Sequence, residues 1–244
     1  MVVSSLRPNS QIFRSAGLAL THPRFENYSN GWNAFSQPFS HYMINSAIVV
    51  TGAILGNLLA CSLAAYAFAR LEFRAKRVLF AIMLPIHVII VLQYVLYSEL
   101  GWVNTFLPLI VPKFLATDAF FIFLMVQFIR GIPREIDEAA RIDGAGHARI
   151  FFHVILPLMV PALATTAIFT FIWTWNDFYT QLIYLTDPDM YTTPLALRTF
   201  VDQQSATDWG SVFAMSVVSL VPVFLVFLAG QRFLLRGIAT TGGK

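Results

Sequence analysis

Charge is the scarcest property of this chain. Only 12% of its 244 residues are Asp, Glu, Lys or Arg, whereas 57% are hydrophobic and 15% are aromatic. A composition this apolar excludes an ordinary soluble domain and is typical of a polytopic membrane protein. The net charge is only +3, and no long basic tract indicates a nucleic-acid partner.

Cysteine is nearly absent as well. Cys61 is the single cysteine, so neither a disulfide nor a cysteine-based zinc site can form within the chain. The five histidines show no paired metal-ligand spacing, and no metal site is predicted. Because Cys61 lies inside an apolar run, we expect it to be a small, buried core residue.

Catalytic motifs are also missing from the sequence. Gly242-Gly243-Lys244 lacks the earlier glycine, the terminal Ser or Thr and the following helix of a phosphate-binding loop. Neither a nucleophile with its base nor a buried acidic relay is recognisable. We therefore do not expect an enzyme, and the energy for an active process must come from another polypeptide.

The chain contains several long apolar segments. A membrane helix needs roughly 20 predominantly apolar residues, and five segments qualify, which predicts an all-α, polytopic membrane bundle. The third segment carries Lys113 and Asp118, so its membrane part is expected from about Leu115 onward, with Lys113 near the interface. Prolines such as Pro157 are expected to kink the spans. The five visible spans are 42–69, 78–98, 106–129, 150–176 and 210–231.

Lys and Arg residues are distributed unevenly between the loops on the two sides of the membrane. The side with more of them, here the richer side, is expected to be cytoplasmic. This leaves the amino terminus outside, although the apolar region within Met1 to Pro8 is too short for a signal peptide. The simplest interpretation is that an upstream span is missing and that Val2 and Val3 form its last turn. The richer side holds Arg70, Arg74, Lys76, Arg77, Arg130, Arg134, Arg141, Arg149, Arg232, Arg236 and Lys244; the other holds Arg7, Arg14, Arg24, Lys113 and Arg198.

A charged segment, residues 130–156, follows the third span on the cytoplasmic side. Pro133 suits the first turn of a helix, and Gly144 suits its end, after which a second helix from about residue 145 to 154 leads into the next span. Asp137 and Arg141 are expected to pair on the flank of the first helix. From these features alone, the segment is either a solvated amphipathic loop or a helix that docks onto a soluble partner.

The same segment carries a recognisable motif. Glu138-Ala139-Ala140, three residues, Gly144, nine residues, and Val154-Ile155-Leu156-Pro157 resemble the signature of the membrane subunits of binding-protein-dependent ABC importers, with Val154 at the usual Ile position. Ala65 to Arg70 and Trp175-Asn176-Asp177 make the chain similar to the carbohydrate branch of that family, of the maltose-permease type. The resemblance covers nearly the whole chain. It implies one permease domain, residues 1–244, with five visible spans of the six-span type I fold and the first span missing.

The resemblance also implies partners. The helix in loop 130–156 would dock onto a cytoplasmic ATPase, present in two copies that bind ATP and Mg, while this chain holds no cofactor. A second homologous permease subunit and an extracytoplasmic binding protein would complete the complex in a prokaryotic cell membrane. External loop 177–209 would either reach into the binding protein or serve as a plain connection. The residues expected to couple to the ATPase are Glu138, Ala139, Ala140, Arg141, Asp143, Gly144, Leu156 and Pro157.

Polar and aromatic side chains at membrane depth are candidates for a solute pathway, although hydrogen bonds between helices are a commoner use of membrane Asn and Gln. Amides and aromatic faces would suit a sugar. The expected function is therefore import of a sugar or oligosaccharide. The alternatives are a permease for another solute, such as glycerol phosphate or an amino acid, and a secondary transporter or membrane enzyme. The candidate pathway residues are Asn57, Gln93, Tyr94, Trp173 and Asn176.

Overall fold

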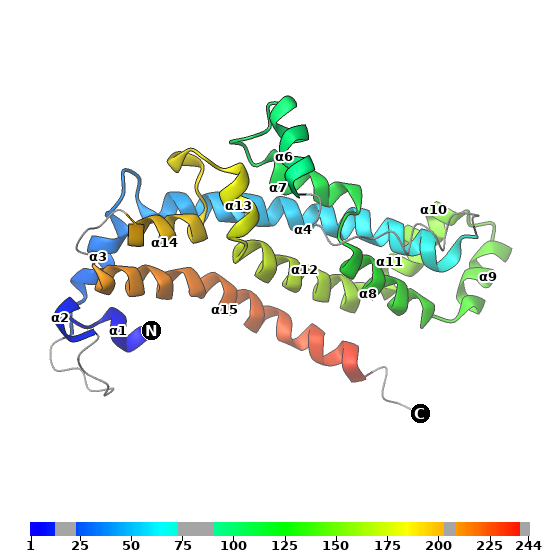
Figure 1. The fold of residues 1–244 in the computed structure, drawn as a ribbon. Helices are drawn as coiled ribbons and strands as arrows, with labels where there is room; N and C mark the ends of the chain where they lie inside the picture. The colour runs from blue at the N-terminus through cyan, green and yellow to red at the C-terminus, as the bar shows by residue number, and fades with distance from the viewer. Residues whose placement is uncertain (13–22, 73–89, 203–207, 240–244) are drawn as a thin grey trace.

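The computed structural model describes residues 1–12, 23–72, 90–202 and 208–239. Within these ranges every regular element is a helix, and there is no strand. The expected all-α class is therefore confirmed for this part of the chain. Figure 1 shows the longest helices running side by side, with α3 (Glu26–Trp32) and α14 (Thr193–Asp202) at one end of the molecule and α9 (Arg134–Ile142) at the other.

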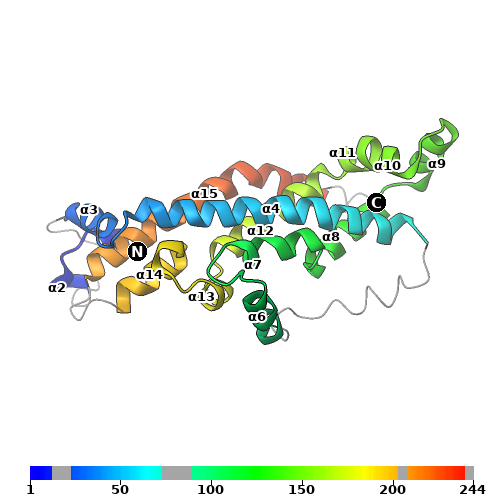
Figure 2. The same cartoon turned by 90° about the horizontal axis from the view of Figure 1, so that it is seen from above.

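The spine of the bundle is α4 (Phe39–Arg70), which contains the first expected span. Pro38 precedes it in an extended conformation, and proline is tolerated there because the first N–H groups of a helix have no intrahelical partner. Its 32 residues extend about 48 Å at 1.5 Å per residue, compared with roughly 30 Å for the hydrocarbon core of a bilayer. Accordingly, α4 runs from one end of the molecule to the other (Figure 2).

The segment that packs beside α4 is broken. It consists of α7 (Leu107–Ile110), the 3-10 turn η2 (Val111–Leu115) and α8 (Ala119–Arg130), and Ala116 between the last two has φ 54°. Prolines in α7 and η2 lack the N–H group that a continuous helix needs, which accounts for the irregular first half of this segment. Taken together, Leu107–Arg130 is long and apolar enough to cross a membrane.

Two glycines of α4 allow this broken segment to approach closely. A Cβ atom on Gly52 would lie 2.8 Å from the side chain of Ile110, and one on Gly56 would lie 2.9 Å from the backbone of Lys113. Glycines four residues apart share one helix face and are typical of close helix contacts in membranes. Lys113 therefore lies beside the middle of α4.

The expected span 150–176 is divided into two arms. One arm contains α10 (His147–Ile150), the π-helical turn η3 (Phe151–Ile155) and α11 (Leu156–Leu158); the other is α12 (Val160–Trp175), and the two are bent by 73°. A proline in α11 cannot donate to the carbonyl four residues earlier, and its ring crowds that carbonyl, which accounts for the π turn and the bend. The arm that packs lengthwise on α4 and α15 is α12.

The last expected span lies within α15 (Trp209–Ala239), whose start is held by residues from the beginning of the chain. Asn9, on α2 (Asn9–Ile12), accepts a hydrogen bond from the Gly210 N–H at 2.8 Å. Burial opposes ionisation of Asp208, but hydrogen bonds from Ser211, Asn9 and two backbone N–H groups outweigh it and lower the pKa of Asp208. Helices α3 and α1 (Val2–Ser5) also pack on α15.

The external segment is fastened to the outer half of α4. After α13 (Tyr179–Tyr184), the chain passes through the 3-10 turn η4 (Pro188–Met190) into α14. The Asn45 amide donates to the carbonyls of Asp189 and Tyr191 at 3.0 and 2.9 Å. The described part of loop 177–209 is therefore packed along the spine.

Most of the second expected span, 78–98, lies outside the described residues, which resume at α6 (Ile90–Glu99). Three helical segments in the described ranges are long and apolar enough to cross a membrane, and the bent pair ending in α12 makes a fourth. Cys61 is fully buried in the core between α4, α8 and η3, as expected. These features are those of a multi-pass membrane protein.

The close contact at Gly56 yields a prediction. A Gly56→Ala substitution should destabilise the protein by about 1–3 kcal/mol, because the added methyl group would overlap the Lys113 backbone and displace η2. Thermal unfolding of the detergent-solubilised protein measures this effect. Gly146→Ala is the matched control, because no heavy atom lies within 4 Å of a Cβ built there. Equal melting temperatures for the two variants would contradict the prediction.

Candidate functional site

The charged loop 130–156 forms a short helix with a defined ending. Gly144, at φ +79°, follows α9, and its N–H donates to the Arg141 carbonyl at 2.9 Å. The Ala145 N–H donates to the Ala140 carbonyl, also at 2.9 Å. This pair of bonds is the Schellman ending, in which a residue with positive φ closes the helix. The predicted end of the helix at Gly144 is therefore confirmed, while the second helix starts at His147.

Most of the predicted coupling residues lie on the open side of α9. Glu138, Ala139, Arg141, Asp143 and Gly144 are all exposed. Beside them, the Ile142 side chain is an apolar group with 87% of its surface exposed, whereas Ala140 packs against the inner core. One side of α9 is thus anchored, and the other offers charged groups around an exposed isoleucine.

The last two predicted coupling residues have a different setting. Leu156 packs against the inner core, and Pro157 is exposed at the start of α11. Both belong to the arm that bends before α12. They therefore shape the turn of the chain and lie apart from the exposed side of α9.

A buried ion pair anchors α9 to the spine. Arg70, the last residue of α4, places its Nε atom 2.7 Å from an oxygen of Asp137, and both side chains are more than 90% buried. The same guanidinium donates through Nη2 to the Ile132 carbonyl at 2.8 Å. The expected pairing of Asp137 with Arg141 is not among the ion pairs of the described residues, because Asp137 is turned toward α4 instead.

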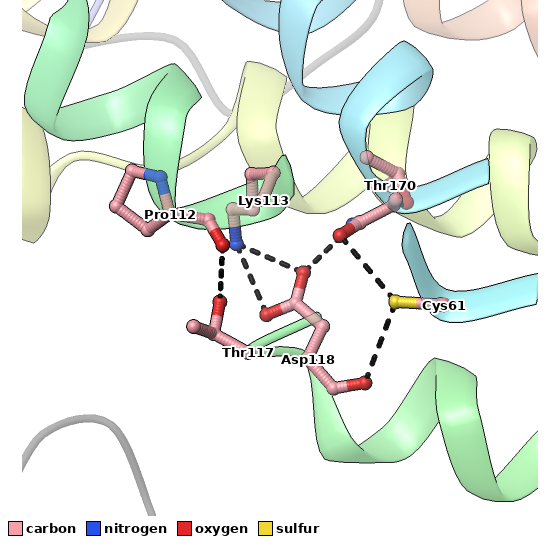
Figure 3. Close-up of polar contacts among 7 residues, drawn as sticks. Cys61, Pro112, Lys113, Thr117, Asp118 and Thr170 are labelled. Atoms are coloured by element: carbon pink, nitrogen blue, oxygen red, sulfur yellow. Dashed lines mark hydrogen bonds and ion pairs between the residues drawn. The ribbon is translucent and has the colours of Figure 1, made fainter. Parts of the chain in front are cut away.

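A second polar cluster joins the residues before α8 to α4 and α12 (Figure 3). Lys113 Nζ lies 3.1 and 2.9 Å from the two carboxylate oxygens of Asp118. The Asn57 amide of α4 donates to Asp118 at 2.7 Å and to the hydroxyl of Thr170 on α12 at 3.1 Å. Charged side chains at membrane depth are costly unless paired, so this cluster satisfies both charges and joins three segments.

A cavity of about 190 Å³ opens beside the ion pair. Its walls come from α4, α6, α7, η2, α12 and α13, together with Asp118 before α8 and Asp177 before α13. The lining combines hydrogen-bonding groups with aromatic rings, which is the composition of a small-molecule site. Its members include Gln93, Tyr97, Lys113, Asp118, Trp173 and Tyr184.

The structure brings most of the predicted pathway residues to this region. Gln93 and Trp173 line the cavity directly, and Asn57 is bonded to Asp118 beside it. Tyr94 stacks on Tyr184 with ring centroids 6.3 Å apart.

Asn176 is the exception among the predicted pathway residues. It follows the last residue of α12, and its amide donates to the Ile172 carbonyl at 2.7 Å. The Asn176 side chain thus terminates a helix and is not part of the cavity lining.

Sequence reasoning missed two ion pairs and the Tyr184 side chain that lines the cavity. Lys113 and Asp118 are charges of opposite sign inside an apolar segment, and that signal alone marks them as a functional candidate in a membrane protein. Arg70 and Asp137 lie in different segments, and no local pattern indicates that they meet. Tyr184 had no signal either, since it lies in the polar external loop.

Comparisons with known proteins agree with this geometry. Residues 52–239 match the family model described as "Binding-protein-dependent transport system inner membrane component". The chain is 34% identical to the diacetylchitobiose uptake system permease protein NgcG of Streptomyces coelicolor, covering 95% of this chain and 78% of that protein. It is 32% identical to the trehalose/maltose transport system permease protein MalG of Thermococcus litoralis, covering 87% and 78%.

The fold also has a solved counterpart. A bacterial ABC transporter involved in the import of the acidic polysaccharide alginate contains a chain that matches with a TM-score of 0.81 at 22% identity. The match covers 96% of this chain and 88% of that one. Likeness at this identity shows a shared arrangement of helices.

The Arg70–Asp137 pair yields a second prediction. Arg70→Met and Asp137→Leu should each destabilise the protein by about 3 kcal/mol, because each leaves a buried charge without its partner. The double variant should lose clearly less stability than the sum of the losses in the two single variants. Chemical unfolding in detergent measures the cycle, with Arg130→Met, at an exposed position, as the control. Strictly additive losses would show that the two groups do not interact.

Proposed function

The chain belongs to the family of binding-protein-dependent transport system inner membrane components, and on this premise we propose that it is the permease subunit of an ATP-driven importer of a sugar or oligosaccharide. It is a multi-pass membrane protein and one part of a larger transporter. Its own role is to form the passage and to move in response to another subunit.

The main observation in support of this function is the way in which α9 is built. The helix is held on its inner side by a buried ion pair, ends at a left-handed glycine, and exposes Ile142 among charged residues. Such a helix suits docking into a groove on a soluble ATPase. We propose that Glu138, Ala139, Arg141, Asp143 and Gly144 make that contact, while Ala140, Leu156 and Pro157 hold the loop in place.

We also propose the composition of the complex. The permease would pair with a homologous permease and rest on two copies of a cytoplasmic ATPase, which would bind ATP and Mg. An extracytoplasmic binding protein would dock at the end that carries α3 and α14. This chain would serve as a single permease domain and would contribute no cofactor of its own.

The sugar assignment is supported by the relatives and by the cavity. The two curated relatives described above are named for diacetylchitobiose and trehalose/maltose transport. Amides and aromatic rings around the cavity suit a solute rich in hydroxyl groups. The alternatives of a glycerol phosphate permease and a secondary transporter are not favoured by these features.

Uptake assays test the proposed function directly. The chain, co-expressed with its partner subunits and reconstituted into proteoliposomes, should take up at least one labelled neutral sugar from a panel that also contains glycerol 3-phosphate and an amino acid. Uptake should require ATP inside and the binding protein outside. Proteoliposomes without ATP are the control. Uptake of the sugar by the purified chain alone would instead indicate a secondary transporter.

Docking of α9 is tested at Gly144. Gly144→Pro should reduce ATP-driven uptake by more than tenfold, because proline fixes φ near −65° and removes the N–H that bonds to Arg141. Gly144→Asn is the matched control, since asparagine tolerates positive φ, and it should keep most of the activity. Both variants should still insert into the membrane. Normal uptake and assembly in Gly144→Pro would contradict the docking role.

A further inference from the structure

We propose that the buried Arg70–Asp137 pair transmits the movement of the ATPase from α9 to α4, so that the amount of solute taken up per ATP hydrolysed depends on this pair. Arg70 and Asp137 are then positioning residues, because they act through the two helices that they join. The inference rests on the proposed function, since it concerns the helix that meets the ATPase. It adds the two side chains through which a movement of that helix reaches the spine.

Helix α9 is attached to the bundle mainly by one charged side chain. Of its nine residues, all of them described, Asp137 alone is buried. The two isoleucines of the helix, Ile136 and Ile142, are exposed, and Ala140 adds a half-buried contact with the inner core. Apolar packing therefore contributes little to holding α9. Its position relative to the spine depends on the bond that Asp137 makes.

The partner of Asp137 holds two parts of the loop at once. Arg70 Nε lies 2.7 Å from Asp137, in the first turn of α9, and Arg70 Nη2 donates to the Ile132 carbonyl at 2.8 Å, in the connection before that helix. The guanidinium is planar and rigid, so it fixes both directions together. A single side chain at the end of α4 thus holds α9 and the residues that lead into it.

Burial makes this pair costly to open. Both side chains are more than 90% buried, and removing one partner from a buried pair is strongly unfavourable, whereas exposed ion pairs contribute little. The helix dipoles favour the same arrangement, since Arg70 lies in the last turn of α4 and Asp137 in the first turn of α9. When α9 is displaced, the pair should therefore stay closed and α4 should move with it.

Helix α4 leads from this pair to the polar cluster beside the cavity. Its inner half belongs to a buried core, in which Ala65 and Ala69 of α4 cluster with residues of α8 and η3. Further along the same helix, the Asn57 amide donates to Asp118 and to Thr170. Packed side chains, hydrogen bonds and a rigid helix are the elements that can carry coupling between distant sites. A movement of α9 can thus reach the cluster through one continuous helix.

The coupling ratio, the amount of sugar taken up per ATP hydrolysed, tests the proposal in the reconstituted complex with the neutral sugar that the uptake panel identifies. The double variant Arg70→Met/Asp137→Leu removes both charges together, so no buried charge is left unpaired and the complex should assemble. ATP hydrolysis should continue, but the coupling ratio should fall roughly tenfold. Arg70→Lys keeps the charge without the planar guanidinium, and its ratio should lie between those of the wild type and the double variant.

Arg130→Met is the matched control, because Arg130 is an exposed arginine at the end of α8. It should keep the wild-type coupling ratio. A merely structural pair predicts that uptake and ATP hydrolysis fall together as the protein loses stability, which leaves their ratio unchanged. A wild-type ratio in the Arg70→Met/Asp137→Leu complex would therefore overturn the proposal.

Spin labels test the movement itself. Leu59→Cys on α4 and Glu135→Cys on α9 place labels at exposed positions, and the native Cys61 is fully buried. In the whole complex, the distance between the labels should change by less than about 2 Å between the ATP-free and ATP-bound states, because the two helices move as one body. In the Arg70→Met/Asp137→Leu background, the distance should shift or spread more widely on ATP binding. A larger change with the pair intact would show that α9 moves independently of α4.

The outcomes separate the two proposals. If the wild-type complex takes up a neutral sugar with ATP but the double variant keeps both the coupling ratio and the label distance, the role of the pair is refuted and the proposed function stands. If the wild-type complex shows no ATP-dependent uptake of any sugar, the proposed function fails and the role of the pair falls with it.

Discussion

The close approach of η2 to α4 at Gly56 is the contact on which the rest of the structure depends. No larger residue fits there without displacing the Lys113 backbone. Because η2 lies this close, Asp118 falls within hydrogen-bond distance of Asn57, and Asn57 in turn reaches Thr170 on α12. Three segments are thus joined by one polar cluster, and the cavity forms at its side. Gly56, which has no side chain, therefore allows the Lys113 and Asp118 charges to pair inside the bundle.

The spine also connects the two candidate sites of the molecule, the polar cluster with its cavity and α9. Asn57 holds the cluster at the middle of α4, and Arg70 holds α9 at its end, about 20 Å away at 1.5 Å per residue. A displacement of α9 relative to α4 would have to break a buried ion pair and a hydrogen bond to the Ile132 carbonyl. These contacts favour movement of α9 and the inner end of α4 as one body. A force applied at the exposed side of α9 would then act on the helix that lines the cavity.

The sequence predicted the outline of this structure because long apolar runs and a left-handed glycine are local signals. The span at 42–69, the helix that ends at Gly144 and the burial of Cys61 were all foreseen in this way. The errors concern pairs of distant residues. No local pattern indicated that the Lys113–Asp118 pair lies against Gly56 of α4. Asp137 was assigned to Arg141 by helical spacing, although the buried Arg70 is its partner.

The breaks in the helices and the cavity have a common physical origin. In hydrocarbon, irregular backbone is tolerated only where protein groups or a cavity satisfy its polar atoms. At the break after η2, the Thr117 hydroxyl donates to the Pro112 carbonyl at 2.9 Å. A straight helix through residues 107–130 would need no such bonds, but it would also have no turn to place a lysine and an aspartate side by side. The prolines that interrupt the spans are therefore part of what creates a polar cavity inside an apolar protein.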